Sequence, residues 1–509
     1  MIQLRDYQEQ GCSAVYAAAR AGSRRSVLCS PVGSGKTAMM AEMARRARKP
    51  LVLSPSLALL YQLKDNLTKW LGEDVDVEQG VNRASANSLF QKRVVVASRQ
   101  SMLSRGRYKG PAFDGTSLVI VDECHIGVTP ALTAMLTHFE KAGAYVVGLS
   151  ATPYKGKGKP LPYWDRPCFS YSLLQAIKDG WLVRPKGFIS QSVTVDLTMV
   201  DEVAHEWHAG QLAAVLTAEH AVQEIASLVL QTFAVKPSAV YCHCVQQAKL
   251  VAEVLGRYGH KVSLVYSAQP MPERIANMEA FRTGETKIIC NVGILSYGWD
   301  HPHLINVYNA APTMSLGRYE QRIGRGTRAL PDVLKHGMSQ QERLAAIAAS
   351  DKPHFNVYDI TDTSRSMQLI NALDVLDSAC TESPERRERA MAAMADGVDI
   401  IEEGERQDEI DREKMLLAAE ELKEKRRNLV VGMTFDHENR DLFSAGSDAP
   451  PKERGWRMLY GKYKGTLLRD VPDWQLARVV QTTKKSVPFK VACSAEINRR
   501  SSLRSVEVA

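Results

Sequence analysis

The sequence predicts an α/β protein with two tandem parallel sheets, each covered by helices on both faces, and a mainly helical C-terminal region. Short apolar runs rich in Val, Leu and Ile alternate with amphipathic stretches over residues 1–187. The same alternation restarts near Phe188, and the composition shifts toward Glu, Arg, Lys and Ala after Asp362. Near-continuous apolar strands separated by helices are typical of parallel sheets that are buried on both faces.

The chain length supports a division into several domains. At roughly 150 residues per domain, the 509 residues suggest about three domains. We expect a first α/β domain at residues 1–187 and a second at residues 188–362. A charged helical region and linker should occupy residues 363–445, and a small basic and aromatic module residues 446–509.

Composition and charge narrow the class of protein. Hydrophobic residues make up 45% of the chain and charged residues 24%, which is the balance of an ordinary globular protein. A net charge of +8 is compatible with a polyanionic partner. No apolar run is long enough for a membrane span, and the polar start MIQLRDYQEQG is unlike a signal peptide. We therefore expect a cytoplasmic protein without a membrane partner.

The nine cysteines give no metal-site pattern. The closest pair, Cys242 and Cys244, belongs to the apolar run AVYCHCV, and no CxxC partner follows it. We therefore expect no zinc and interpret these residues as core cysteines in a reducing compartment.

The expected strands follow the chain in two sets. The first set is SVLCS, PLVLSP, RVVVAS, SLVIVDE and YVVGLSAT. The second set is SAVYCHCV, KVSLVYS, TKIICNV, LINVYNAA and HFNVYDI. Helices are expected between them in TAMMAEMARRAR, SLALLYQLKDNLTKWL, VQQAKLVAEVLGRYG and PERIANMEAFRTG. Residues 384–428 carry Glu and Lys at helical spacing and predict a long solvated helix or a short coiled coil.

A strand, a tight turn and a helix are predicted around the segment PVGSGKT. Glycines in the turn let backbone N–H groups approach phosphate oxygens, and the helix N-terminus adds positive potential. Lys36 would contact the outer phosphates, and the Thr37 hydroxyl could bind Mg²⁺. The pattern G-x-x-x-x-G-K-[ST] is met except at its first position, which is Ser30. The predicted nucleotide-binding residues here are Pro31, Val32, Gly33, Ser34, Gly35, Lys36 and Thr37.

Two adjacent carboxylates end the buried strand in SLVIVDECH. The carboxyl end of a strand in a parallel sheet is where ligand sites form. We expect Asp122 to hold Mg²⁺, directly or through water, and Glu123 to orient and deprotonate the attacking water.

Four segments in a fixed order resemble the motifs of superfamily 2 helicases of the DEAD/DEAH-box type. They are PVGSGKT, DECH, SAT at Ser150–Thr152, and QRIGRGTR at Gln321–Arg328. The resemblance covers roughly residues 1–362 and implies two RecA-like domains with ATP and Mg²⁺ bound between them. Within the superfamily the chain most resembles bacterial RadD-like and phage helicases, near the type III restriction-subunit branch. A bacterial or phage-infected cell is therefore the expected setting.

The same resemblance implies roles for further residues. In LRDYQ, Gln8 would contact the adenine base, with Arg5 close to it. Gly298 and Asp300 would lie near the nucleotide, and Ser150, Ala151 and Thr152 would couple the two sites. Nucleic acid would meet polar backbone at two strand–helix junctions. The residues implied there are Ser54, Pro55, Gln62, Ser98, Arg99 and Gln100.

The segment QRIGRGTR is expected to start a helix that faces the cleft between the domains. Gln321, Arg325 and Arg328 would share one face of that helix because their spacing is three to four residues. Arginine suits a planar, permanently charged contact with phosphate. Arg328, with Arg325 beside it, is the predicted arginine finger. The predicted catalytic residues are Lys36, Glu123, Gln321, Arg325 and Arg328.

The expected function is an ATP-dependent nucleic-acid motor, a DNA helicase or translocase in repair, recombination or replication. The DECH variant favours DNA over RNA. Three alternatives remain open: the translocating subunit of a restriction or defence system, an RNA helicase, and a nucleotide-bound scaffold that remodels a protein complex.

For two further segments, the sequence is compatible with more than one function. YKGKGKP, at Tyr154–Pro160, is either a basic phosphate contact or a solvated loop. RadD-like relatives carry a cysteine-rich zinc segment after the motor, but this chain has only Cys380 and Cys493 there. The terminal module is either a nucleic-acid binder or a structural cap. Its basic and aromatic residues are Tyr460, Lys462, Tyr463, Lys464, Arg469 and Trp474.

Overall fold

The computed structural model describes most of the chain in two compact units, Met1–Leu416 and Leu417–Ala509, which are considered separately. The described residues are 3–85, 87, 90–126, 128–151, 154–155, 159–160, 163–165, 167–195, 197, 200–203, 206–295, 300–362, 384–394, 397–434, 466–482 and 493–497.

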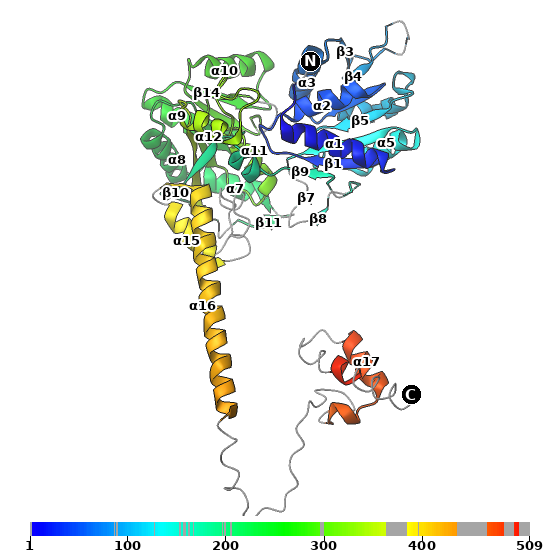
Figure 1. Ribbon diagram of the computed structural model, residues 1–509. Coiled ribbons are helices and arrows are strands. Elements are labelled where there is room, and N and C mark those ends of the chain that lie inside the picture. Colours follow the sequence, from blue (N-terminus) through cyan, green and yellow to red (C-terminus); the bar gives the residue numbers. More distant parts are fainter. Residues whose placement is uncertain are drawn as a thin grey trace, which may run out of the picture. The chain divides into compact units, whose positions relative to one another are not determined.

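The first unit contains two seven-stranded sheets flanked by helices (Figure 1). The first sheet is parallel throughout, in the order β3-β4-β2-β5-β6-β1-β9. Its strands are β1 Arg25–Cys29, β2 Pro50–Ser54, β3 Val75–Glu78, β4 Val94–Ser98, β5 Leu118–Val121, β6 Tyr145–Ser150 and β9 Phe169–Ser170. Its helices are α1 Asp6–Arg20, α2 Lys36–Arg46, α3 Leu57–Leu71, α4 Arg99–Leu103 and α5 Pro130–Lys141, with two 3-10 turns, η1 Ser104–Lys109 and η2 Pro111–Phe113.

Alternating residues of these strands fill two cores, one on each face of the first sheet. Leu28 and Val52 pack with α1, α2 and α3 on one face. Val27 and Leu51 pack with α5 and η2 on the other. Neighbouring strand residues point to opposite faces, so a strand that is apolar throughout is required when both faces are covered.

The second sheet has the order β14-β15-β13-β16-β17-β10-β18. Six strands are parallel, and the short edge strand β18 is antiparallel to β10. The strands are β10 Arg184–Val195, β13 Ser238–Cys242, β14 Val262–Tyr266, β15 Ile288–Val292, β16 Asn306–Ala310, β17 His354–Asp362 and β18 Val398–Asp399. The helices are α6 Leu173–Lys178, α7 Ala209–Leu216, α8 Glu219–Thr232, α9 Val245–Arg257, α10 Met271–Thr283, α11 Leu316–Ile323 and α12 Gln340–Ala348. Short hairpins are formed by β7 Tyr154–Lys155 with β8 Lys159–Pro160, and by β11 Glu202–Val203 with β12 Glu206–Trp207.

The predicted fold class is confirmed. All ten predicted strands are present, and the four predicted interstrand helices appear as α2, α3, α9 and α10. Among the described residues, four strands of the two large sheets were not predicted, namely β3, β9, β10 and β18, and neither were the short hairpin strands β7, β8, β11 and β12.

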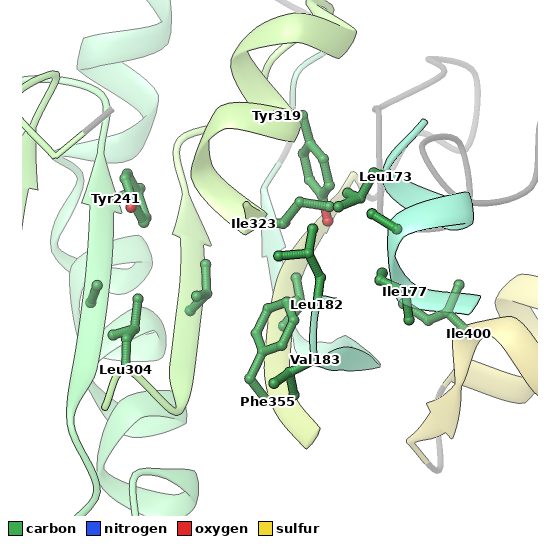
Figure 2. Packing of buried hydrophobic residues seen from close by; sticks show 14 of the residues in the cluster. Leu173, Ile177, Leu182, Val183, Tyr241, Leu304, Tyr319, Ile323, Phe355 and Ile400 are labelled. Carbon is green, nitrogen blue, oxygen red and sulfur yellow. The ribbon is translucent and has the colours of Figure 1, made fainter. Parts of the chain in front are cut away.

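The domain boundaries differ from the prediction. The second sheet begins with β10 at Arg184, before the expected boundary at residue 187. Residues beyond the predicted end at Asp362 also belong to this domain, because Met394 and Ile400 lie in its core with Ile177 and Phe355. Figure 2 shows Ile400 in the same apolar cluster as Ile177 of α6.

The charged region is therefore partly a structural element of the second domain. It forms α15 Pro384–Ala393, β18 and the 35-residue helix α16 Ile400–Thr434. Arg386 of α15 is buried and donates to Asp408 at 2.8 Å, to Asp411 at 3.0 Å and to the Gly404 carbonyl at 3.1 Å. These bonds fix α15 against the first half of α16.

The second compact unit includes η5 Leu468–Asp470 and α17 Asp473–Thr482. Leu468, Val471, Leu476, Val479 and Cys493 form a small buried cluster within it. Trp474 is 62% exposed. The described residues do not include Tyr460, Lys462, Tyr463, Lys464 or Cys380. The side chain of Arg469 is likewise not described.

Two features of the described residues concern a membrane or a metal ion as partner. No single helix there is long and apolar enough to cross a membrane, and only the pair α7–α8, bent by 68°, meets the length and composition criteria jointly. No cluster of three or more His, Cys, Asp or Glu side chains suited to a metal ion occurs among them. Cys242 ends β13, whereas the Cys244 thiol caps α9 by accepting from the Gln247 N–H.

Candidate active site

The turn between β1 and α2 has the geometry of a phosphate-binding loop. Gly33 and Gly35 adopt left-handed backbone angles, with φ of 84° and 76°, which glycine reaches without steric cost. The Ser30 hydroxyl donates to Ser34 Oγ at 2.6 Å, and Ser34 Oγ donates to the Pro31 carbonyl at 2.7 Å. Ser30, which replaces a glycine of the general pattern, thus braces the loop from inside.

Lys36 stands at the first position of α2 and reaches back over this loop. Its ammonium donates to the carbonyls of Ser30 at 3.2 Å and Pro31 at 3.4 Å. It also lies 3.9 Å from Glu123 Oε1. The ammonium, the helix N-terminus and the loop amides therefore converge on one point, which is the arrangement that favours polyphosphate.

The carboxylates of Asp122 and Glu123 follow β5 and are both buried. Asp122 Oδ1 accepts from the Glu123 N–H at 3.0 Å. Burial, with Glu123 adding to it, raises the pKa of Asp122 to about 7. Glu123 has a left-handed φ of 47°, and its Oε2 accepts no hydrogen bond from the described residues. A buried acidic pair of this kind suits a divalent cation, whose preferred ligands are carboxylate and hydroxyl oxygens.

Arg99, expected from the sequence to lie near nucleic acid, contacts the acidic segment. Its guanidinium is buried and donates to the backbone carbonyls of Asp122, Glu123 at 3.0 Å and Ile126 at 2.6 Å. Burial lowers the pKa of this guanidinium, opposed by Asp122. The Arg99 side chain therefore holds the acidic segment in place, and the contact of this junction with nucleic acid stays a prediction.

The histidine of the DECH segment, which the sequence reasoning overlooked, connects three motifs. His125 Nδ1 lies 2.8 Å from Ser150 Oγ, and His125 Nε2 lies 3.2 Å from Gln321 Nε2. Burial lowers the pKa of His125, and a neutral ring has one donor and one acceptor. The Gln321 amide then donates to Nε2, and Nδ1–H donates to Ser150. This bridge crosses between the two domains.

The helix predicted over QRIGRGTR is shorter than expected. α11 ends at Ile323, so Arg325 and Arg328 lie in the turns that follow it and not on a shared helical face with Gln321. A Cβ on Gly326 would approach Phe355 to 2.2 Å, so the backbone packs too closely on β17 for any side chain there. This close packing of Gly326 on Phe355 determines the backbone conformation of the segment after α11.

The two arginines are nevertheless brought to the phosphate-binding loop. A Cβ on Gly324 would lie 2.6 Å from Val32, and a Cβ on Gly33 would lie 3.4 Å from the Arg328 side chain. Arg325 is 5% exposed, and burial and Arg328 together lower its pKa to about 10. Arg328 forms an ion pair with Asp300.

Two further buried ionisable groups surround this segment, and neither was singled out from the sequence. Burial raises the pKa of Glu320 to about 7, against the favourable charge of Lys36. Lys352 is 1% exposed and donates to the carbonyls of Pro302 at 2.6 Å and Arg328 at 2.9 Å. Burial lowers the pKa of Lys352 to about 7.

The start of α1 packs against the same loop. Gln8 Nε2 donates to the Ser34 carbonyl at 2.8 Å, and Gln8 Oε1 accepts from the Arg5 N–H at 2.9 Å. The Arg5 guanidinium stacks 4.6 Å from the Trp181 ring. A cavity of about 450 Å³ opens here, lined by Gln3, Arg5, Gln8, Gly33, Gly35, Ala38, Lys69 and Trp70. Lys69 and Trp70 were not predicted as site residues, because they lie at the end of a long amphipathic helix.

Some of the residues expected to contact nucleic acid are buried, and others are exposed. Ser54 and Ser98 are buried, Ser54 donating to the Ser56 carbonyl and Ser98 capping α4. Pro55 is half-buried, whereas Gln62 and Gln100 are exposed.

Two expected residues, Thr152 and Gly298, lie outside the described residues, while Ala151 is buried beside Ser150. Thr37 is half-buried in the first turn of α2, next to Lys36.

Comparisons with known proteins agree with this geometry. A family model for the res subunit of type III restriction enzymes matches residues 1–155, and a model for the helicase conserved C-terminal domain matches residues 221–330. The chain is 26% identical to IRC3 of Saccharomyces cerevisiae, to which ATP-dependent helicase activity is ascribed by name, over 64% of this chain and 49% of that protein. It is 28% identical to irc3 of Schizosaccharomyces pombe, named as mitochondrial, over 64% of this chain and 55% of that protein.

A solved structure shares the fold. It is a fragment assigned as the HsdR subunit of a type I restriction enzyme from Vibrio vulnificus YJ016, with a TM-score of 0.51 and 22% identity over 70% of this chain and 64% of that one.

A phosphate-binding loop, an acidic pair and arginines from a second α/β domain are the features of a two-domain P-loop fold of the RecA-like class. The two family models and the yeast relatives support a superfamily 2 helicase related to the type III restriction subunits. The chain spans about half the length of the yeast relatives that it matches. Those relatives do not support the bacterial or phage setting that the sequence suggested.

Proposed function

We propose that this chain hydrolyses ATP to move along nucleic acid, as a DNA helicase or translocase. One observation carries the proposal. The His125–Gln321 bridge and the close approach of Gly324 to Val32 bring the arginine segment of the second domain onto the phosphate-binding loop of the first. Groups from both domains then share one active site, so hydrolysis and domain movement are coupled.

Each residue has a chemical task in this proposal. Lys36 and the loop amides bind the β- and γ-phosphates. Glu123 accepts the proton of the attacking water, and its carboxylate is held toward the loop by Lys36. Arg325 and Arg328 neutralise the charge that develops on the γ-phosphoryl group. Mg²⁺, held by Asp122 and the Thr37 hydroxyl, would supply further charge neutralisation when bound.

The chain also places the nucleotide base. Gln8 ties the start of α1 to the Ser34 carbonyl of the phosphate-binding loop. The adjoining cavity carries the Arg5 and Trp70 side chains on its walls. A planar base and a flat aromatic or guanidinium group stack favourably, so this cavity fits an adenine.

DNA is the proposed track. The restriction-subunit family model over residues 1–155 supports DNA, because restriction enzymes act on it. RNA is the second candidate, since residues of this chain match RNA helicases named dbp8 from Aspergillus species with 31% to 33% identity over 94 residues. A restriction motor that translocates along DNA would have the same ATPase site, but it would not separate the two strands.

The test is an ATPase assay with single-stranded, duplex and forked DNA and with RNA, comparing the wild type with Glu123→Gln. We expect the variant to lose hydrolysis by about 10²-fold or more and to keep ATP binding. Exposed Glu253→Gln on α9 is the matched control and should hydrolyse normally. Normal hydrolysis by Glu123→Gln would refute the assigned base. A rate that no polymer raises would refute the motor and favour a nucleotide-bound scaffold.

A further inference from the structure

A tight turn in the first domain displays an apolar side chain to solvent. Residues Gln79–Asn82 follow β3 and close on themselves, with Gln79 N–H donating to the Asn82 carbonyl at 2.9 Å and the reverse bond at 2.8 Å. Gly80 has a left-handed φ of 56°. Val81 at the tip is 93% exposed, the highest value among the large hydrophobic side chains described.

This turn is held firmly by its surroundings. The Tyr61 hydroxyl donates to Gln79 Oε1 at 3.2 Å and accepts from Asn82 Nδ2 at 3.2 Å. The Gly80 N–H donates to Ser101 Oγ at 3.1 Å, and Gly80 O accepts from Arg107 at 3.0 Å. Both polar groups of the Gly80 backbone are thus fixed by α4 and η1. An exposed valine on such a well-anchored turn does nothing for the fold itself.

The surface beside the turn is basic. Arg83 and Arg107 lie 3.4 and 3.0 Å from the same Glu78 oxygen, so one carboxylate balances two guanidinium groups. Glu78 is also buried, and its other oxygen accepts from the Ala84 N–H at 2.9 Å. Arg105 and Lys109, both exposed, follow in η1. The Arg83 side chain is 56% exposed and that of Arg107 only 17%, so Arg83, Arg105 and Lys109 carry the outward-facing positive charge around the turn.

The anchors of the turn come from helices at the carboxyl edge of the first sheet. Tyr61 is on α3, which follows β2, and Ser101 is on α4, which follows β4. Ser54 and Ser98, at the ends of these strands, are paired in the sheet. Exposed Gln62 is next to Tyr61. The turn thus sits on the two junctions at which nucleic acid is expected to bind.

We propose that Tyr61 and Val81 form a platform on which bases of a single nucleic-acid strand stack, while Arg83 contacts its phosphates. Tyr61 is 44% exposed, and its ring reaches the turn that carries Val81. Apolar and aromatic surface flanked by arginine is the chemistry that binds single strands without sequence preference. This inference rests on the proposed function and names a contact surface for the strand.

The experiment measures, by fluorescence anisotropy, the binding of fluorescein-labelled oligothymidylate and oligouridylate. Each oligonucleotide has about 20 nucleotides, a length that exceeds the usual footprint of one domain. Tyr61→Ala and Val81→Asp should each weaken binding about tenfold. Tyr61→Phe keeps the ring and loses only the bonds to the turn, so it should retain part of the affinity. Val81→Ala should weaken binding without changing its salt dependence, whereas Arg83→Ala should flatten that dependence.

Matched controls are exposed residues of the second domain. Tyr258 is 66% exposed and Ile275 is 59% exposed, and Tyr258→Ala and Ile275→Asp should bind like the wild type. Circular dichroism melts of every variant check the fold. If the Tyr61 and Val81 variants bind with wild-type affinity, the proposed stacking platform is wrong, whereas the proposed motor function is unaffected. A wild type that binds no oligonucleotide, of DNA or of RNA, overturns the motor and the platform together, and leaves a protein partner for this surface.

Discussion

Arg99 illustrates how a single buried charge can support a catalytic segment without touching substrate. Three backbone carbonyls of the acidic segment accept from one guanidinium. A buried carbonyl that loses its donor costs about 1–3 kcal/mol. The turn at Glu123, with its left-handed φ of 47°, depends on that support. Arginine suits the position because its planar fork can serve several acceptors at once.

We predict that Arg99→Met lowers the free energy of unfolding by about 3 kcal/mol, since three acceptors lose their donor. Denaturant unfolding measures this, and ATP hydrolysis should fall as well because Glu123 loses its fixed orientation. Arg105→Met, at an exposed position, should leave stability unchanged. Equal stability of the two variants would contradict the role given to Arg99.

Lys352 predicts a pH dependence of stability. Burial depresses its pKa from 10.5 to about 7. Between these values the unfolded chain binds a proton that the folded chain does not, so stability rises with pH across this window and is lost as pH falls through it.

In Lys352→Met we expect this slope to disappear. The free energy of unfolding of the wild type, relative to the variant, should fall by a few kcal/mol between about pH 9.5 and pH 7, at ~1.36 kcal/mol per pKa unit. Guanidinium titrations at several pH values measure the difference. Exposed Lys236→Met should follow the wild type throughout. A constant difference between the wild type and Lys352→Met would show that Lys352 is not desolvated.

At the scale of elements, the ends of β5, β6 and α11 meet at His125. Ser150 ends β6 and Gln321 is on α11, so one imidazole connects the acidic segment, the first domain's last core strand and the second domain. A movement of α11 relative to the first sheet must break or shift this bridge. The bridge is thus a physical route from domain position to the position of Glu123.

We predict that His125→Ala and Gln321→Ala are not additive. Each alone should reduce the ATPase rate in the presence of nucleic acid, and the double variant should lose little more, with an interaction energy of about 1 kcal/mol. A double-mutant cycle on the turnover rate measures it. Fully additive losses would mean that the two side chains act separately.

Elements were predictable from the sequence where the apolar pattern was strong. VVVAS and LVIV are buried throughout and were found as strands. Val75–Glu78 was missed because VDVE is short and half polar, and β18 because it has only two residues. The phosphate-binding loop and acidic pair were identified because their chemistry is local in sequence. The structural role of Arg99, and the residues His125 and Lys352, were not predicted, because their partners lie far along the chain.

At the scale of the whole molecule, the second domain extends beyond the point at which the sequence pattern fades. Ala390, Met394 and Ile400 fill its core, and Arg184 pairs with Asp399 at 3.0 Å. The charged composition of residues 384–428 concealed this role. The solvated face of a helix dominates its composition, while a few apolar residues on the other face are enough to anchor it.

We predict that a chain ending after Leu416 folds cooperatively, whereas a chain ending after residue 383 does not. The shorter chain lacks Ala390, Met394 and Ile400 and exposes the apolar cluster around Ile177. Thermal melts and binding of a hydrophobic dye distinguish the two chains. Identical cooperative melts would mean that α15 and the start of α16 are dispensable for the second domain.

The serine that begins the phosphate-binding loop has a thermodynamic consequence. Ser30, Ser34 and Pro31 are linked by successive hydrogen bonds of 2.6 and 2.7 Å, so the loop keeps its curvature by internal bonds. A ligand that meets a rigid cradle gives up little of its binding free energy to ordering the receptor. The affinity for nucleotide is then set mainly by electrostatic attraction and by direct contacts with the ligand. A loop that becomes ordered only when phosphate binds would lose conformational entropy on binding, and this loop should lose less.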